Sequence, residues 1–156
     1  MQRWIVPGIV IGIVAMVLTA VGGYFALKIY KQNRPAPVWV PLPINPDFSS
    51  EKTREIVNEL KSRLSEPELL QRVSKDLALT GPWEKASDKE CAAEIGRRLF
   101  VRSGEADTPM GKVPAIHVGV DGKRKEFELS GKIAMRLMDD VWPILGMDPP
   151  QKPEAD

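Results

Sequence analysis

The sequence contains few of the residue types that bind metals or act as nucleophiles. Its 156 residues include one cysteine, Cys91, and one histidine, His117. A single cysteine excludes an intrachain disulfide, and one cysteine with one histidine do not make a credible metal site. Cys91 shares the apolar face of a helical run, residues 88–100, with Ile95 and Leu99, so we expect it to be a small buried core residue. An intermolecular disulfide is the alternative.

The sequence also lacks the common catalytic motifs. It contains no phosphate loop, no G-x-S-x-G and no dinucleotide fingerprint. The neighbouring carboxylates Asp139 and Asp140 occupy adjacent helix positions, which do not face each other, and are expected to be a solvated helix surface. His117 lies in the middle of a predicted strand, on the face opposite Ile116 and Val118. We therefore predict no catalytic, cofactor-binding or metal-binding residues, no cofactor and no enzymatic activity.

Charge is unevenly distributed along the chain. The net charge is +1 overall, but residues 1–34 carry +4 and the remainder carries −3. A domain without a basic excess argues against nucleic-acid binding. Basic residues beside an apolar segment are expected next to anionic lipid headgroups, so membrane lipid is a predicted partner.

Residues 4–27 form an uncharged stretch of 24 residues. About 20 apolar residues span a bilayer, and the run is longer than the apolar part of a signal peptide, so a retained transmembrane helix is predicted. Trp4 at one end and Tyr24 and Tyr30 at the other are placed for the two interfaces. The flanking positive charges slightly favour a cytoplasmic domain, so they specify the orientation only weakly.

Small residues recur within this stretch at spacings of three and four. This spacing places them on one helix face, where a partner helix could approach closely. The alternative is the general richness of membrane helices in glycine and alanine. The predicted helix–helix contact residues are Gly8, Gly12, Ala15, Thr19 and Gly22.

The chain divides into four predicted segments. Residues 1–34 form the anchor with its flanks, and residues 35–48 a proline-rich linker or edge strand, with a short strand over 38–40. Residues 49–146 form an α+β domain outside the membrane. Residues 147–156 form a polar, proline-rich tail that we expect to be disordered.

Helical spacing predicts three helices early in the domain. The first begins at Ser49 or Ser50 and runs to Ser65. A capping box over residues 65–68 starts the second, which ends at Gly81-Pro82, and a capping box at Ser87 starts the third.

Strand patterns follow these helices. Residues 99–102 and 113–120 read as strands, with a loop between them. Asp121-Gly122 predicts a hairpin turn to a paired strand over 125–129, and Ser130 caps a last helix limited by Pro143. The predicted fold class is α+β: one N-terminal transmembrane helix and a small layered domain with a mostly antiparallel sheet of three to four strands and three to four helices.

Basic residues near the predicted hairpin tip form a candidate site for an anion or a lipid headgroup. The alternative is a solvated turn and helix end. The residues are Arg97, Arg98, Lys123, Arg124 and Lys125, with Arg102 nearby.

Residues 56–63, with Ser62-Arg63, and the leucine-rich run 69–79 resemble a helix of the Wzz family, the polysaccharide co-polymerases or chain-length determinants. Residues 114–120 and 130–134 resemble that family's later strand and helix. The chain departs from the family in having no second membrane helix, no long helical extension and no kinase domain. The resemblance implies an extracytoplasmic domain that oligomerises in the bacterial inner membrane, and no catalytic residue.

Three functions follow in order of preference. The first is a non-enzymatic, single-pass, Wzz-like membrane assembly protein acting in surface polysaccharide export or chain-length control. The second is an accessory structural subunit of a larger membrane complex, respiratory or photosynthetic. A membrane-tethered enzyme is the least favoured. The predicted partners are lipid and a membrane protein or a second copy, met through the transmembrane helix.

Overall fold

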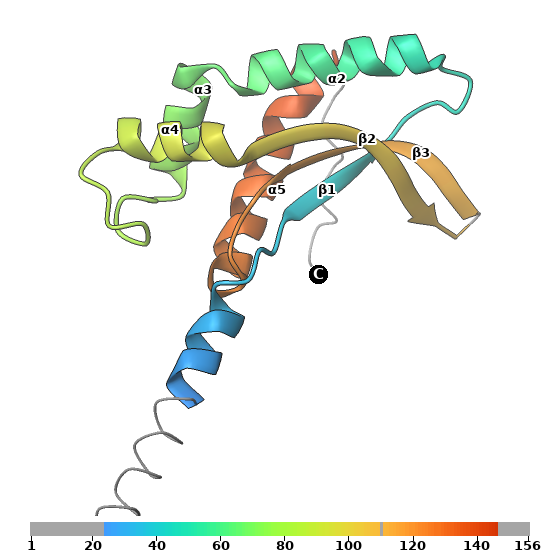
Figure 1. The fold of residues 1–156 in the computed structure, drawn as a ribbon. Coiled ribbons are helices and arrows are strands. Elements are labelled where there is room, and N and C mark those ends of the chain that lie inside the picture. The colour runs from blue at the N-terminus through green and yellow to red at the C-terminus, as the bar shows by residue number, and fades with distance from the viewer. Residues whose placement is uncertain (1–23, 110, 147–156) are drawn as a thin grey trace, which may run out of the picture.

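The computed structural model describes residues 24–109 and 111–146. A helix over residues 24–32 leads into an α+β domain with a three-stranded antiparallel sheet (Figure 1). The sheet order is β1-β3-β2, so the long strand β3 lies between two edge strands. The elements in chain order are β1 (Val38–Pro43), α2 (Ser50–Leu64), α3 (Pro67–Asp76), α4 (Asp88–Arg98), β2 (Leu99–Thr108), β3 (Gly111–Val120), the 3₁₀ helix η2 (Arg124–Glu126) and α5 (Phe127–Ile144).

The register of the sheet separates its two faces. Val118 of β3 pairs with Val40 of β1 and with Val101 of β2. Its neighbour His117 pairs with Pro41 and Arg102. Since successive side chains of a strand point to opposite faces, the valines share one face and His117 lies on the other. The predicted position of His117, opposite the buried side chains of this strand, is confirmed.

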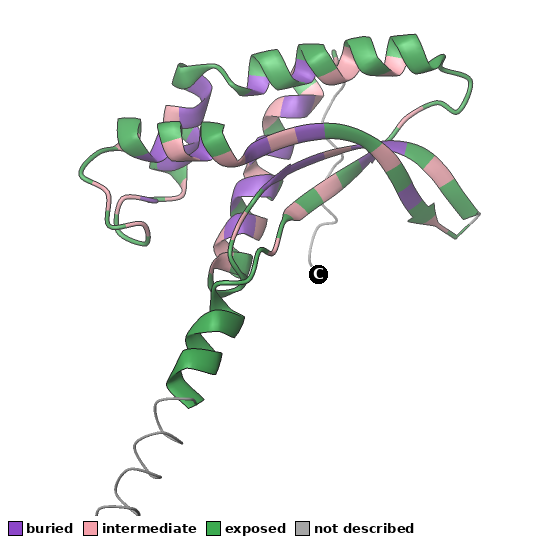
Figure 2. Ribbon diagram, viewed as in Figure 1, coloured by how far each residue is buried: buried purple, intermediate pink, exposed green. Residues whose placement is uncertain are grey.

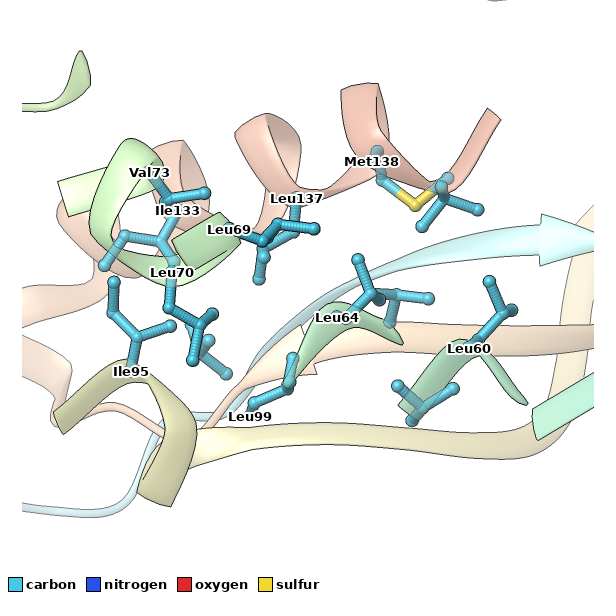
Figure 3. Close-up of a cluster of buried hydrophobic side chains, with 14 of the residues drawn as sticks. Leu60, Leu64, Leu69, Leu70, Val73, Ile95, Leu99, Ile133, Leu137 and Met138 are labelled. Carbon is cyan, nitrogen blue, oxygen red and sulfur yellow. The ribbon is translucent and has the colours of Figure 1, made fainter. Parts of the chain in front are cut away.

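The hydrophobic core lies between the valine face of the sheet and the helices. Helix α5 packs on β3 and β1, α2 packs on β2, and α3 packs on α4. Buried residues run along one side of each element (Figure 2), and leucines from α2, α3 and α5 meet in the centre (Figure 3). The fully buried large side chains include Leu60, Leu64, Val73, Ile95, Ile116, Ile133 and Leu137.

Two of the predicted helix starts are confirmed. The Ser49 hydroxyl accepts a hydrogen bond from the Lys52 amide at the start of α2, and Ser87 does the same for the Glu90 amide at the start of α4. These bonds satisfy amides that have no partner inside the helix. Strand β1 confirms the predicted edge strand and extends it to Pro43.

The predicted capping box at residues 65–68 is wrong. Ser65 ends α2 instead, and its hydroxyl donates a hydrogen bond to the Lys61 carbonyl oxygen at 2.6 Å. Helix α3 begins at Pro67, and no side chain caps it. The same helix ends at Asp76, well before Gly81-Pro82, because residues 77–84 form turns.

The predicted hairpin at Asp121-Gly122 is also wrong. Strand β3 pairs instead with β2, which extends through Gly104 to Thr108, and with β1. Residues 124–126 form η2, and α5 begins at Phe127 rather than after Ser130. The physical reason is that β3 is paired on both sides, with β1 and with β2, so no edge of this strand remains for residues 125–129.

The predicted fold class needs correction in its transmembrane component. Within residues 24–109 and 111–146, no helix is both long enough and apolar enough to cross a membrane. The longest helix, α5, has charged residues on its outer side, including Lys132 and Arg136. The prediction of a single-pass inner-membrane protein is overturned for this part of the chain, and residues 1–23 lie outside the described residues.

Candidate functional site

The sheet face opposite the core carries a cluster of two aromatic rings, an imidazole and a guanidinium, which we name the aromatic shelf. Its members are Trp39 of β1, Phe100 and Arg102 of β2, and His117 of β3. None of the four belongs to the core cluster. Trp39 is 40% exposed, which is high for so large an apolar side chain. The shelf is therefore a surface available for contact.

His117 is held in place on the shelf by two contacts. Its ring stacks on Trp39 with 5.6 Å between centroids and 23° between planes. Its Nε2 lies 2.9 Å from the carbonyl oxygen of Glu105, close enough for the N–H form to donate a hydrogen bond. A group fixed in this way loses little side-chain entropy when a partner binds.

Two glycines make room for these rings. A Cβ on Gly104 would lie 2.5 Å from Cε1 of His117, so the imidazole occupies the space that a side chain would fill. A Cβ on Gly119 would lie 2.7 Å from the Cα of Trp39 and would also meet the Val38 carbonyl oxygen. The missing side chains at these two positions leave the space that the His117 and Trp39 rings need.

Arg102 supplies the positive charge of the shelf. Its guanidinium carbon lies 4.8 Å from the centroid of Phe100 and 5.6 Å from that of Trp39, both within range of a cation–π contact. Among the described residues, no carboxylate forms an ion pair with Arg102. Its N–H groups are thus available to an anionic group on a partner.

The predicted basic patch is divided by the structure. Arg98 donates hydrogen bonds to Glu94 at 2.7 Å and to Glu126 at 2.8 Å, and Arg97 also pairs with Glu94. Both arginines therefore interact with carboxylates rather than presenting free positive charge. Lys123, Arg124 and Lys125 form no ion pair within the described residues. Arg124 and Lys125 line a groove beside residues 24–34, and Lys125 also lines the hollow that contains Glu94, Arg98 and Glu126.

Burial and charge compete at Glu94. Burial is the largest single influence and would raise its pKa, but the hydrogen bond and charge of Arg98, with the charges of Arg97 and Lys85, outweigh it and lower the pKa. For Arg98, burial acts to lower the pKa, while Glu94 and Glu126 raise it further above its ordinary value. This network is a structural clamp between α4 and η2.

The structure tests the prediction for Cys91 but does not describe the small-residue stripe. Cys91 is buried, as predicted. Gly8, Gly12, Ala15, Thr19 and Gly22 lie outside the described residues. In the part of the chain that the structure describes, no three His, Cys, Asp or Glu side chains gather as metal ligands would.

Sequence reasoning placed His117 on the face opposite the core but assigned it no role, named Arg102 only beside the predicted basic patch, and missed Trp39 and Phe100. Trp39, Phe100 and His117 come from three segments, and only the β1-β3-β2 order brings them together. The available signal was local: Trp39 lies between Val38 and Val40, which are less exposed than it is, so it points away from the core.

Comparison of the chain with protein-family models, with curated proteins and with solved structures gives no match. The resemblance to the Wzz family therefore stays a prediction.

Proposed function

We propose that this chain is a non-enzymatic assembly protein whose domain binds a second copy of itself through the aromatic shelf. The observation that carries the proposal is the exposed Trp39–His117 stack beside an arginine that has no carboxylate partner. Trp and Arg are the residues most enriched among the energetically important positions of protein interfaces.

The same chain offers a complementary surface on α2. Glu51, Glu55 and Glu59 are exposed and recur at a spacing of four, so they form one stripe on the side of the helix away from Leu60 and Leu64. Among the described residues, none of these three carboxylates forms an ion pair. This stripe can supply the carboxylate that Arg102 lacks.

Contact between two different surfaces makes the association head to tail. A twofold contact of shelf with shelf would bring two Arg102 side chains toward each other, which is unfavourable. A shelf placed against the α2 stripe of the next copy pairs opposite charges instead. Such a heterologous contact closes into a ring if its rotation permits and otherwise extends into a filament.

A charge swap tests the proposal. The molar mass of the full chain is measured by light scattering after gel filtration in a neutral detergent, across a range of concentrations. Arg102→Glu is expected to weaken self-association at least tenfold, and Glu55→Arg with Glu59→Arg is expected to do the same. Combining the three substitutions restores opposite charges and is expected to recover much of the association.

The control reverses the charge at two positions outside the stripe, by Glu68→Arg on α3 and Glu90→Arg on α4. This variant should associate as the wild type does. A wild-type chain that remains a monomer at every concentration overturns the proposal, as does an Arg102→Glu variant that associates normally. Circular dichroism establishes that each variant is folded.

A further inference from the structure

A second charged surface lies where the N-terminal helix meets the domain. The Ala36 amide donates to the Gly122 carbonyl at 2.8 Å, and the Arg124 amide donates to the Arg34 carbonyl at 3.0 Å. Pro35 and Lys123 form a β-bridge between these bonds. Segments about 90 residues apart in the sequence are thereby fixed side by side.

This junction gathers six basic side chains, which we name the basic collar: Lys28, Lys31, Arg34, Lys123, Arg124 and Lys125. Five of them line one groove between the helix and the domain together with Tyr24 and Leu27, and no carboxylate lines this groove. These five are Lys28, Lys31, Arg34, Arg124 and Lys125. None of the six forms an ion pair within the described residues. Such a concentration of unpaired positive charge attracts an anionic partner.

The helix that contributes Lys28 and Lys31 to the collar also exposes apolar side chains. Tyr24, Phe25, Leu27, Ile29 and Tyr30 are each more than half exposed. Figure 2 shows this segment exposed throughout its length as it leaves the domain. The Arg34 guanidinium lies 5.1 Å from the centroid of Tyr30. Aromatic rings, aliphatic side chains and lysines within residues 24–32 match the chemistry of a lipid headgroup region, where rings and aliphatic chains contact acyl chains and charges contact phosphates.

We infer that the basic collar binds the phosphate groups of anionic lipid headgroups. A protein partner would be expected to interact with a defined face, whereas this helix exposes apolar groups on all sides. The pairing of segment 34–36 with 122–124 sets how the domain sits above that lipid surface, because Lys123, Arg124 and Lys125 contact the same headgroups as the helix. The inference is independent of the proposed self-association.

The test compares binding of the full chain to two vesicle populations, phosphatidylcholine alone and phosphatidylcholine mixed with phosphatidylglycerol. The ratio of the two affinities isolates the electrostatic contribution to binding, because the apolar contacts are the same with both kinds of vesicle. The wild type is expected to prefer the anionic vesicles, with a preference that falls as salt increases. Each neutralised collar residue is expected to reduce the preference roughly fivefold.

The variant Lys123→Gln, Arg124→Gln, Lys125→Gln leaves the backbone bonds at the junction intact. Its matched control neutralises three exposed lysines on other helices: Lys61, Lys75 and Lys89. The inference is supported if the first variant loses its preference for anionic vesicles and the control variant keeps it. An unchanged preference in the first variant, or an equal loss in the control, overturns it. Inorganic phosphate that abolishes the preference at an ionic strength where chloride does not would show a free-phosphate site and would also overturn it.

Discussion

The His117 imidazole and the Trp39 indole lie nearly parallel across the strand pair β3–β1, with 5.6 Å between their centroids. The chain has one histidine, so the position of this ring is observable as a single pair of imidazole signals in an NMR spectrum of a tag-free protein. The indole ring current shifts those signals for as long as the two rings remain stacked.

Gly104→Ala is expected to displace His117 without unfolding the domain. The new methyl group would meet the far end of the His117 side chain, which can move away, rather than the backbone. We expect the imidazole signals to shift toward their random-coil positions and self-association to weaken, while stability changes by about 1 kcal/mol or less. Unshifted imidazole signals would show that the stack does not form in solution.

Gly119→Ala is expected to destabilise the domain by about 1–3 kcal/mol. The added Cβ would meet the backbone of Val38 and Trp39, which cannot move without disrupting the pairing of β1 with β3. Gly131→Ala in α5 is the control, because a Cβ there meets nothing within 4 Å. That variant should gain about 0.5–1 kcal/mol from helix propensity. Urea denaturation measures both, and equal stability of the two variants would contradict the strand pairing.

Leu137→Ala is expected to cost about 2–5 kcal/mol of unfolding free energy, because its side chain is fully buried between α5 and the sheet. Met135, two residues earlier on the same helix, is 63% exposed. Met135→Ala should therefore change stability by about 0.5 kcal/mol or less. Thermal unfolding of the two variants checks which face of α5 is packed on the sheet.

Acid is expected to weaken the clamp between α4 and η2. The pKa of Glu94 in the folded chain is lowered from its ordinary value of 4.5, so its contribution to stability is complete above that pH. The contribution is lost as pH falls from 4.5 toward the lowered pKa, since the unfolded chain takes up the proton more readily. Glu94→Gln should unfold with less dependence on pH in this range. Glu66→Gln, at an exposed ion pair with 3.8 Å between charges, should keep the wild-type dependence.

The predictions from sequence succeeded where the signal was local. Ser49 and Ser87 begin helices because their side chains satisfy amides only three residues away. In the strand over 113–120, Ile116, Val118 and Val120 recur at every second position, and this spacing placed His117 on the opposite, correct face. Cys91 followed from the spacing of a single helix.

The failures came where a local signal competed with packing. Asp121-Gly122 has the composition of a hairpin turn. Gly122 instead allows close packing against α5, because a Cβ at this position would meet the hydroxyl of Ser130. The chain turns into η2 and α5 instead, because β1 and β2 occupy both sides of β3 and leave no edge for a further strand. The capping box at Ser65 failed in the same way, since that hydroxyl is used by the preceding helix.

Sequence alone determined the existence of the four domain helices, the starts of α2 and α4, and the central strand, because each depends on residues close together in the chain. Only the tertiary structure decided which charges act together. Arg98 is paired with Glu126 across 28 residues, whereas Lys123 is joined to the N-terminal helix through Pro35. The shelf likewise exists because the β1-β3-β2 order brings Trp39, Arg102 and His117 to one face. Strand order depends on burial of the whole core, and no short stretch of sequence encodes it.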